Sequence, residues 1–186
     1  MKIGNSALLL ALAPATVSAQ VPKPSPEEPQ SGLLYGPKYA YFLTAPKGWV
    51  IDNQAWASDG IHAVFYPEGS SPSGKRVAYT RFFGSHPKGS LGRADADLAQ
   101  FLSSNPSAII TKHPDMQTRS GLKATIRSTS GDTLGNAEWL AYIEAPTGII
   151  FIALVTKDPK EHPLLRAQFD ELVGSCTWVT DSVQSE

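Results

Sequence analysis

Apolar and aromatic residues gather in short runs that predict β-strands in the first half of the chain. The runs YAYFLTAP (39–46), IHAVFY (61–66) and VAYTRFF (77–83) are rich in aromatic and β-branched residues, which favour strands. Trp49 begins a return segment after the first run, and a loop rich in Gly, Pro and Ser separates the other two. We therefore expect the three runs to form an antiparallel meander.

A second group of strands is predicted in the later half of the chain. Residues 122–128 alternate strictly between apolar and polar types, which predicts a strand with one solvent-exposed face. That exposed face would carry Lys123, Thr125 and Arg127. The runs 137–145 and 149–156 flank a short turn that ends at Gly148, and so predict a hairpin. Because the run 149–156 is apolar throughout, we expect this hairpin at the centre of the sheet.

Two helices are predicted among these strands. Apolar residues recur at helical spacing at Leu91, Ala94, Leu98, Phe101 and Leu102. Ser90 is a suitable N-cap for this helix, and Asn105 with Pro106 would end it. A last helix can begin at Pro163 and end at Gly174, with a short strand after it. The pattern predicts an α+β fold in which helices pack on an antiparallel sheet.

The first nineteen residues have the pattern of a cleavable secretory signal peptide. Lys2 precedes an apolar run at 7–13, and small residues lead up to Ala19. The apolar run is about half the roughly 20 residues that a membrane-spanning helix needs, so we expect no membrane span. We expect cleavage near Ala19 and a secreted or periplasmic product.

The remainder of the chain is expected to be a leader followed by one domain. Residues 20–34 contain several prolines in a polar setting, which favours an extended, flexible leader. Residues 35–182 have a length typical of a single domain with one core. The formal net charge of the full chain is −1, which gives no electrostatic reason to expect nucleic acid as a partner.

A single cysteine excludes an internal disulfide. Cys176 is expected either to be buried and inert or to pair with another chain, and free cysteines favour the interior. No Gly-x-Ser-x-Gly elbow surrounds Ser175 or Cys176, so we expect no covalent catalysis. The histidines are spread along the chain without metal-ligand spacing, at His62, His86, His113 and His162. We therefore predict no metal and no cofactor, and expect His86 and His113, which precede prolines, to be solvated turn residues.

The order of several of these motifs resembles the PsbP-like and Mog1-like domains, including bacterial secreted members. The motifs are Tyr-Phe-Leu-Thr-Ala-Pro at 41–46 followed by Gly48 and Trp49, the mid-chain helix, the hairpin at Gly148, and the ending FDELVGSCTWV at 169–179. The resemblance covers roughly residues 35–180 and implies an α/β/α sandwich around a central antiparallel sheet. It implies little about activity, because such domains serve as a photosystem II accessory subunit, a nuclear-transport factor and envelope proteins. No active-site residue carries over from it.

The segment GSHPKGSLGR (84–93) is the first candidate site. It lies between a predicted strand and a predicted helix, so His86, Lys88 and Arg93 would stand near a helix N-terminus, which favours anions. A P-loop requires Ser or Thr after Gly-Lys, whereas here Lys88 precedes Gly89. The segment is therefore either a flexible connection before a capped helix or a weak site for an anion or ligand.

Trp56 is the second candidate, because it is a tryptophan in the polar segment NQAWASDG. It is expected to be a lid over the sheet or a contact for a partner. Together the residues favour a non-enzymatic binding or accessory protein of the cell envelope, whose partner is another envelope protein or a small ligand. The alternative is an enzyme, such as a hydrolase, with a site assembled from distant residues. A pocket with convergent titratable groups above apolar residues would favour the enzyme.

Overall fold

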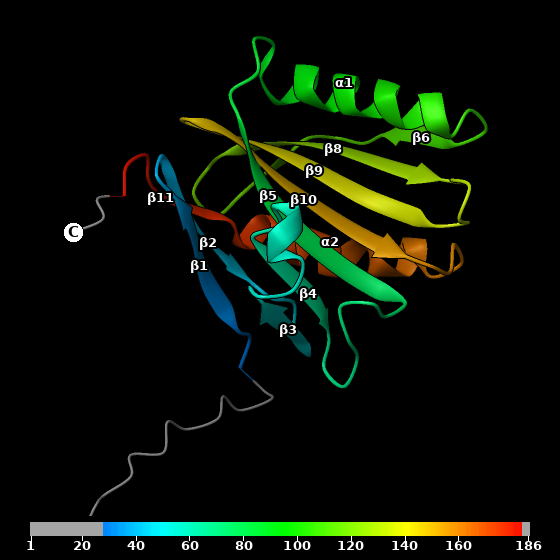
Figure 1. The fold of residues 1–186 in the computed structure, drawn as a ribbon, viewed down its shortest axis with the longest axis horizontal. Helices are drawn as coiled ribbons and strands as arrows, with labels where there is room; N and C mark the ends of the chain where they lie inside the picture. The colour runs from blue at the N-terminus through cyan, green and yellow to red at the C-terminus, as the bar shows by residue number, and fades with distance from the viewer. Residues whose placement is uncertain (1–27, 184–186) are drawn as a thin grey trace, which may run out of the picture.

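A computed structural model describes residues 28–183, which form two antiparallel sheets, two α-helices and two short 3-10 helices (Figure 1). The strands are β1 (Ser31–Gly36), β2 (Tyr39–Thr44), β3 (Trp49–Asp52), β4 (Ala63–Pro67), β5 (Arg76–Gly84), β6 (Ile109–Lys112), β7 (Met116–Gln117), β8 (Lys123–Ser130), β9 (Ala137–Ala145), β10 (Gly148–Thr156) and β11 (Thr177–Thr180). The helices are η1 (Ala57–Asp59), α1 (Gly89–Ser104), η2 (His162–Leu165) and α2 (Arg166–Ser175). Residues 1–19, the predicted signal peptide, lie outside the described residues.

The larger sheet has eight strands, in the order β3-β4-β5-β10-β9-β8-β6 with β7 also paired to β8. The predicted hairpin is confirmed as β9 and β10, and β10 lies in the middle of this order. Gly148 begins β10 where the backbone of β5 comes very close. A Cβ atom on Gly148 would lie 2.2 Å from the carbonyl oxygen of Phe83, so only glycine fits here.

The predicted meander is wrong in one strand. Strand β2 lies in a second sheet with the order β1-β2-β11, whereas the meander that does form is β3-β4-β5. Strand β2 pairs with β1, which precedes it in the sequence, and with β11, which lies near the C-terminal end of the described residues. The leader prediction is also wrong for residues 31–34, which belong to β1 and so lie in the folded domain.

The two helices lie on opposite faces of the larger sheet (Figure 1). Alternate residues of β9 separate these faces: Leu140 and Tyr142 pack with α1, whereas Trp139, Ala141 and Ile143 pack in the core with α2. The smaller sheet adds Tyr41 and Leu43 to the α2 side. The helix predictions are confirmed closely by α1 and by η2 with α2.

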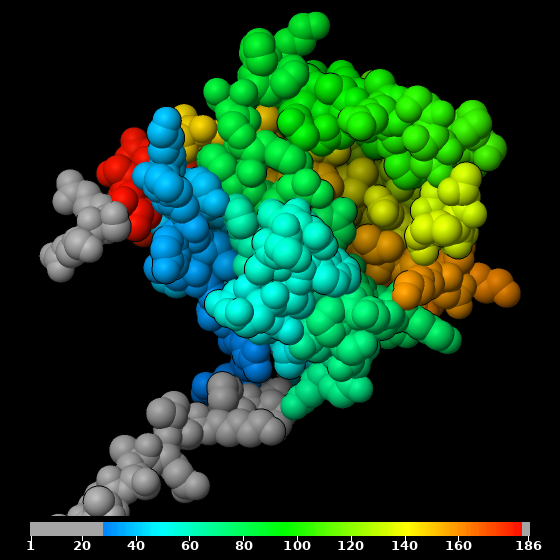
Figure 2. All heavy atoms as spheres, in the orientation of Figure 1, coloured from blue at the N-terminus to red at the C-terminus, as the bar shows by residue number. Residues whose placement is uncertain are grey.

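The exposed face predicted for 122–128 is confirmed at Lys123 but wrong at Thr125 and Arg127. Thr125 and Arg127 are buried on that face, because α1 covers β8 and the Ser90 hydroxyl lies 3.1 Å from that of Thr125. Farther across the same face of the sheet, the η1 segment rather than α1 lies over strands β4 and β5 (Figure 2). A hollow separates the η1 segment from α1 (Figure 2). The antiparallel sheet with a helix on each face is therefore present, but α1 covers its face only in part.

No helix within residues 28–183 combines the length and the apolar character that a membrane span requires.

Candidate functional site

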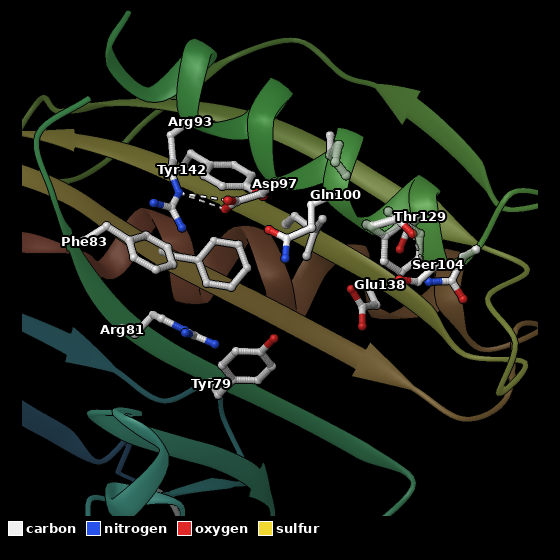
Figure 3. Close-up of a pocket in the computed structure, with 15 residues that line it drawn as sticks. Tyr79, Arg81, Phe83, Arg93, Asp97, Gln100, Ser104, Thr129, Glu138 and Tyr142 are labelled. Carbon is white, nitrogen blue, oxygen red and sulfur yellow. Dashed lines mark hydrogen bonds and ion pairs between the residues drawn. The ribbon is translucent and has the colours of Figure 1, made fainter. Parts of the chain in front are cut away.

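An open pocket of about 470 Å³ lies between α1 and the larger sheet (Figure 3). Its walls come from β5, β8, β9, β10 and one side of α1. The lining residues are Tyr79, Arg81, Phe83, Arg93, Asp97, Leu98, Gln100, Phe101, Ser104, Asn105, Thr129, Glu138, Leu140, Tyr142 and Phe151. Segments far apart in the sequence therefore build one site.

The strand register explains why aromatic rings gather in this pocket. Tyr79, Arg81 and Phe83 alternate along β5 and so point to the same face of the sheet. Phe151 stands opposite Arg81 and, on its other side, opposite Tyr142. The Phe151 ring lies 5.0 to 6.0 Å, centroid to centroid, from the rings of Tyr142, Phe83 and Tyr79. The result is a continuous aromatic wall.

Arg93 closes one end of the pocket from α1. Its Nε lies 2.9 Å from the carboxylate of Asp97, one turn along the helix, so the two charges offset each other. The guanidinium carbon lies 3.7 Å from the centroid of the Phe83 ring, a cation–π contact. Arg93 is the one predicted site residue that lines this pocket, and its Nε–H donates to the Asp97 carboxylate.

Arg81 brings a second guanidinium to the pocket, with a different environment. It has no ion pair among residues 28–183, and its Nε is buried without a hydrogen-bond partner in that part of the chain. Its guanidinium carbon lies 5.3 Å from the centroid of the Phe83 ring. A buried donor without a partner is costly, so this arginine is suited to receive an acceptor from outside the chain.

Glu138 stands on the other side of the pocket. Burial and, to a smaller extent, the nearby Asp132 carboxylate raise the pKa of its carboxyl to about 7, against the opposing effect of a hydrogen bond with Thr129. Figure 3 shows Arg81 and Glu138 on opposite sides, with their polar ends directed into the space between them. Both charged groups affect the pKa of the Tyr79 hydroxyl. Burial and the Glu138 carboxylate raise this pKa to about 12, and the Arg81 guanidinium opposes the rise. Among the residues that the structure describes, the pocket thus holds a cation and a carboxyl group without ion-pair partners, above aromatic residues.

Trp56 lies at the edge of the same sheet face. Its ring meets that of Tyr79 edge to face, with 6.0 Å between centroids, and the residue is 36% exposed. Its φ of 57° is in the left-handed region, which is rare for a bulky residue and concentrates at functional positions. Trp56 therefore contacts Tyr79 and Arg93 contacts Phe83, two residues of β5 that are four positions apart. The choice between lid and partner contact stays a prediction.

His86 and Lys88 lie in the turn before α1, outside the pocket lining. The Nδ1 atom of His86 accepts a hydrogen bond from the Lys88 N–H at 3.2 Å. The helix N-terminus next to them already holds the carboxylate of Glu144, which accepts from the backbone N–H and the hydroxyl of Ser90 at 3.5 and 3.2 Å. Glu144 therefore has the capping role expected of Ser90, and an anion would compete with it.

The sequence pattern alone did not identify Arg81 and Glu138 as site residues. Each is a charged residue on the inward side of an alternating strand, Arg81 between Tyr79 and Phe83, and Glu138 just before Trp139. That alternation could have identified them as buried charges. It could not have shown that they face one pocket, because this depends on the pairing of β5, β10 and β9.

The histidines are packed more closely than the sequence suggested. His62 is hydrogen-bonded to the hydroxyls of Tyr39 and Tyr41, at 2.9 and 3.2 Å. His113 is not a purely solvated residue, because it contacts the Trp139 ring and lies 2.8 Å from the Ser128 hydroxyl. Within residues 28–183, no three His, Cys, Asp or Glu side chains are arranged to hold a metal ion.

Cys176 lies in the core on the α2 side and is fully buried, in agreement with the expectation of an interior cysteine. Burial raises the pKa of its thiol to about 12, so the thiol stays protonated at neutral pH. Its neighbour Ser175 donates its hydroxyl hydrogen bond to the Leu172 carbonyl at 2.7 Å. Both side chains therefore have roles in packing.

No protein-family model matches the chain, and no curated protein matches it. Among solved structures, the chain is similar to the solution structure of cyanobacterial PsbP (CyanoP) from Synechocystis sp. PCC 6803. The TM-score is 0.51 at 14% sequence identity, and the match covers 75% of this chain and 86% of the other. Identity this low bears on fold alone, and the likeness to Mog1-like domains stays a prediction. The chain therefore has a PsbP-like fold.

Proposed function

We propose that the protein is an exported, non-enzymatic binding domain that holds a small ligand in the pocket between α1 and the sheet. The proposal rests on one observation: the pocket combines an aromatic wall with two polar groups, Arg81 and Glu138, that lack a charged partner among residues 28–183. Its volume of about 470 Å³ is within the roughly 300–1,000 Å³ of small-molecule sites. Sites of this class are largely apolar, with few polar groups that orient the ligand.

Packing within the domain accounts for only part of the aromatic wall: Tyr142 and Phe151 are buried in the cluster under α1, whereas Tyr79 and Phe83 are only partly buried. The phenol of Tyr142 and the ring of Phe151 contact each other above the sheet, yet α1 does not extend over the whole aromatic wall. Apolar surface that stays open to water carries a free-energy cost of about 25 cal/mol per Å², which a ligand would recover by covering it. The pocket therefore favours a ligand with an apolar body.

Ligand-observed NMR with 4-methylbenzoate, a small aromatic acid, tests the proposal directly. We expect saturation transfer from the purified domain to the aromatic protons of the probe. Gln100→Trp should abolish the transfer, because Gln100 is a solvent-exposed residue of α1 that lines the pocket, and the larger indole would fill this space (Figure 3).

Ala99→Trp is the matched control, since Ala99 is also exposed on α1 but does not line the pocket. This variant should bind the probe as the parent does. Binding that survives in Gln100→Trp would place the probe elsewhere on the protein. An absence of transfer to the parent at millimolar probe would contradict a pocket for aromatic ligands.

Export is supported by the signal-peptide pattern from Lys2 to Ala19. A periplasmic or secreted location, and action as an accessory protein of the cell envelope, belong to the same proposal. A binding domain in such a compartment meets ligands that are free in solution or displayed by other envelope proteins.

One observation favours the enzyme alternative. A carboxyl group with a pKa of about 7 inside a pocket is suited to general acid–base catalysis at neutral pH. The alternative predicts that Glu138→Gln retains ligand binding while turnover of a bound ester or glycoside is lost. The same variant of a pure binding domain would show no turnover to lose.

A further inference from the structure

We infer that the ligand is dipolar, with an anionic group at Arg81, a cationic or strongly hydrogen-bond-donating group at Glu138, and an aromatic body between them. This inference rests on the proposed function and adds the chemical class of the ligand. It follows from the two unpaired groups, their separation across the pocket, and the rings between them.

Arg81 is the residue that would bind the anionic group of the ligand. Two arginines line the pocket, and Arg93 is paired to Asp97 at 2.9 Å. Arg81 is the one of these two that has no anionic partner among the described residues. Its buried Nε without an acceptor adds an unmet donor. A planar carboxylate, or another oxyanion, satisfies a guanidinium through two parallel hydrogen bonds. The anionic end of the ligand therefore belongs at Arg81.

Glu138 is the residue that would bind the cationic group of the ligand. Glu138 takes part in no ion pair among residues 28–183, and the carboxylate of Asp132 adds negative potential nearby. Carboxyl groups in such surroundings are stabilised in their charged form by an incoming cation. An ammonium group fits this end and would be repelled at the Arg81 end. The two ends therefore impose a direction on the ligand.

The distance between Arg81 and Glu138 sets the length of the ligand. Arg81 on β5 is in register with Tyr142 on β9, four residues from Glu138, so the two residues are two strands and four positions apart. With about 4.8 Å between strands and about 3.4 Å per residue, their Cα atoms are roughly 16 Å apart. The two side chains are directed into the space between them (Figure 3), and no ion pair joins them among residues 28–183, so a ligand that contacts both must span this space. Phe151 and Tyr79 lie along this line.

Three matched probes test the inference: 4-(aminomethyl)benzoate, which is dipolar across one ring, 4-methylbenzoate, which lacks the amine, and 4-methylbenzylamine, which lacks the acid. Isothermal titration at pH 8 keeps Glu138 largely ionised. We expect the dipolar probe to bind at least tenfold more tightly than either singly charged probe, which corresponds to about 1.4 kcal/mol.

Two conservative variants assign the two ends. Arg81→Gln should remove the advantage of the dipolar probe over 4-methylbenzylamine, and Glu138→Gln should remove its advantage over 4-methylbenzoate. Arg119→Gln and Glu171→Gln are the controls, because both residues are exposed and outside the pocket. Circular dichroism and thermal melting confirm that each variant is folded before titration.

The outcomes separate the two proposals. If 4-methylbenzoate binds in a manner blocked by Gln100→Trp but the three probes bind equally, the pocket binds ligands and the dipolar class is wrong. The dipolar class is also wrong if Glu138→Gln leaves the ranking of the three probes unchanged. If none of the probes binds the folded parent protein, the proposed function itself is contradicted.

Discussion

Glu138 shows how a single side chain can make the stability of the domain depend on pH. Its folded-state pKa of about 7 is above the value of 4.5 for an exposed glutamate, so the folded protein holds this proton more tightly than the unfolded chain. Stability from this group is fully present below about pH 4.5 and is lost as the pH rises toward 7. The ionised carboxylate is therefore a cost at alkaline pH.

We predict that Glu138→Gln is more stable than the parent at pH 8 by roughly 2–3 kcal/mol, with little difference at pH 4. Urea unfolding at a series of pH values measures this. Burial lowers the pKa of His62, His113 and His162, but their titration is common to both proteins and cancels in the difference. The exposed Glu171→Gln should show no such trend, and a gap for Glu138→Gln that is independent of pH would contradict the assignment.

Among the elements, the pairing of β10 with β5 is the one that the site depends on most directly. It sets Phe151 opposite Arg81 and so builds one wall of the pocket. Gly148 and Gly84 face each other at the end of this pair, in contrasting surroundings. A Cβ on Gly148 would meet the Phe83 carbonyl oxygen and the Phe82 ring, whereas one on Gly84 would meet nothing within 4 Å.

We therefore predict that Gly148→Ala destabilises the domain by about 1–3 kcal/mol, the usual cost of overpacking, since a backbone atom cannot move aside cheaply. Gly84→Ala should change the free energy of unfolding by less than about 0.5 kcal/mol, as for other substitutions that meet no neighbours. Chemical denaturation of both variants checks the contrast. Equal effects at the two glycines would mean that β5 and β10 separate here at little cost.

Elements with a strong local pattern were predictable from the sequence. The helix α1, the hairpin of β9 and β10 and the helical segment before Gly174 follow from periodicity and turn residues. Strand β1 was not, because its short SGLLYG run is weakly apolar and follows a proline-rich stretch. The burial of Arg127 was also unpredictable, since it depends on which face of β8 the helix α1 covers.

The candidate site could be predicted only in part, because local sequence features do not show how distant strands pair. Arg93 was identified from its place near a helix start, which is a local feature. Arg81 and Glu138 become a pair only through the register of three strands, and register is a property of tertiary structure. His86 and Lys88 had the expected location, but the carboxylate of Glu144, from a strand far along the chain, holds the helix end beside them.

At the scale of the whole molecule, export is the property that an experiment can settle first. Expressed in a Gram-negative host, the mature protein should begin at or near Gln20, because small residues precede Ala19. N-terminal sequencing of the periplasmic or secreted product measures this. Leu9→Arg, which places a charge in the apolar run, should leave the chain unprocessed. A parent product that retains Met1 would contradict the signal peptide.

The smaller sheet has a consequence for the order in which the chain is made. Strand β2 pairs with β11, and Phe42 and Thr177 are partners although they are far apart in the sequence. A ribosome adds roughly 5–20 residues per second and releases β2 long before β11 exists. Such non-local pairing closes late and slows folding. The nascent chain therefore lacks its closing strand throughout most of its synthesis, so under the proposed export it would reach a secretion channel before this sheet closes.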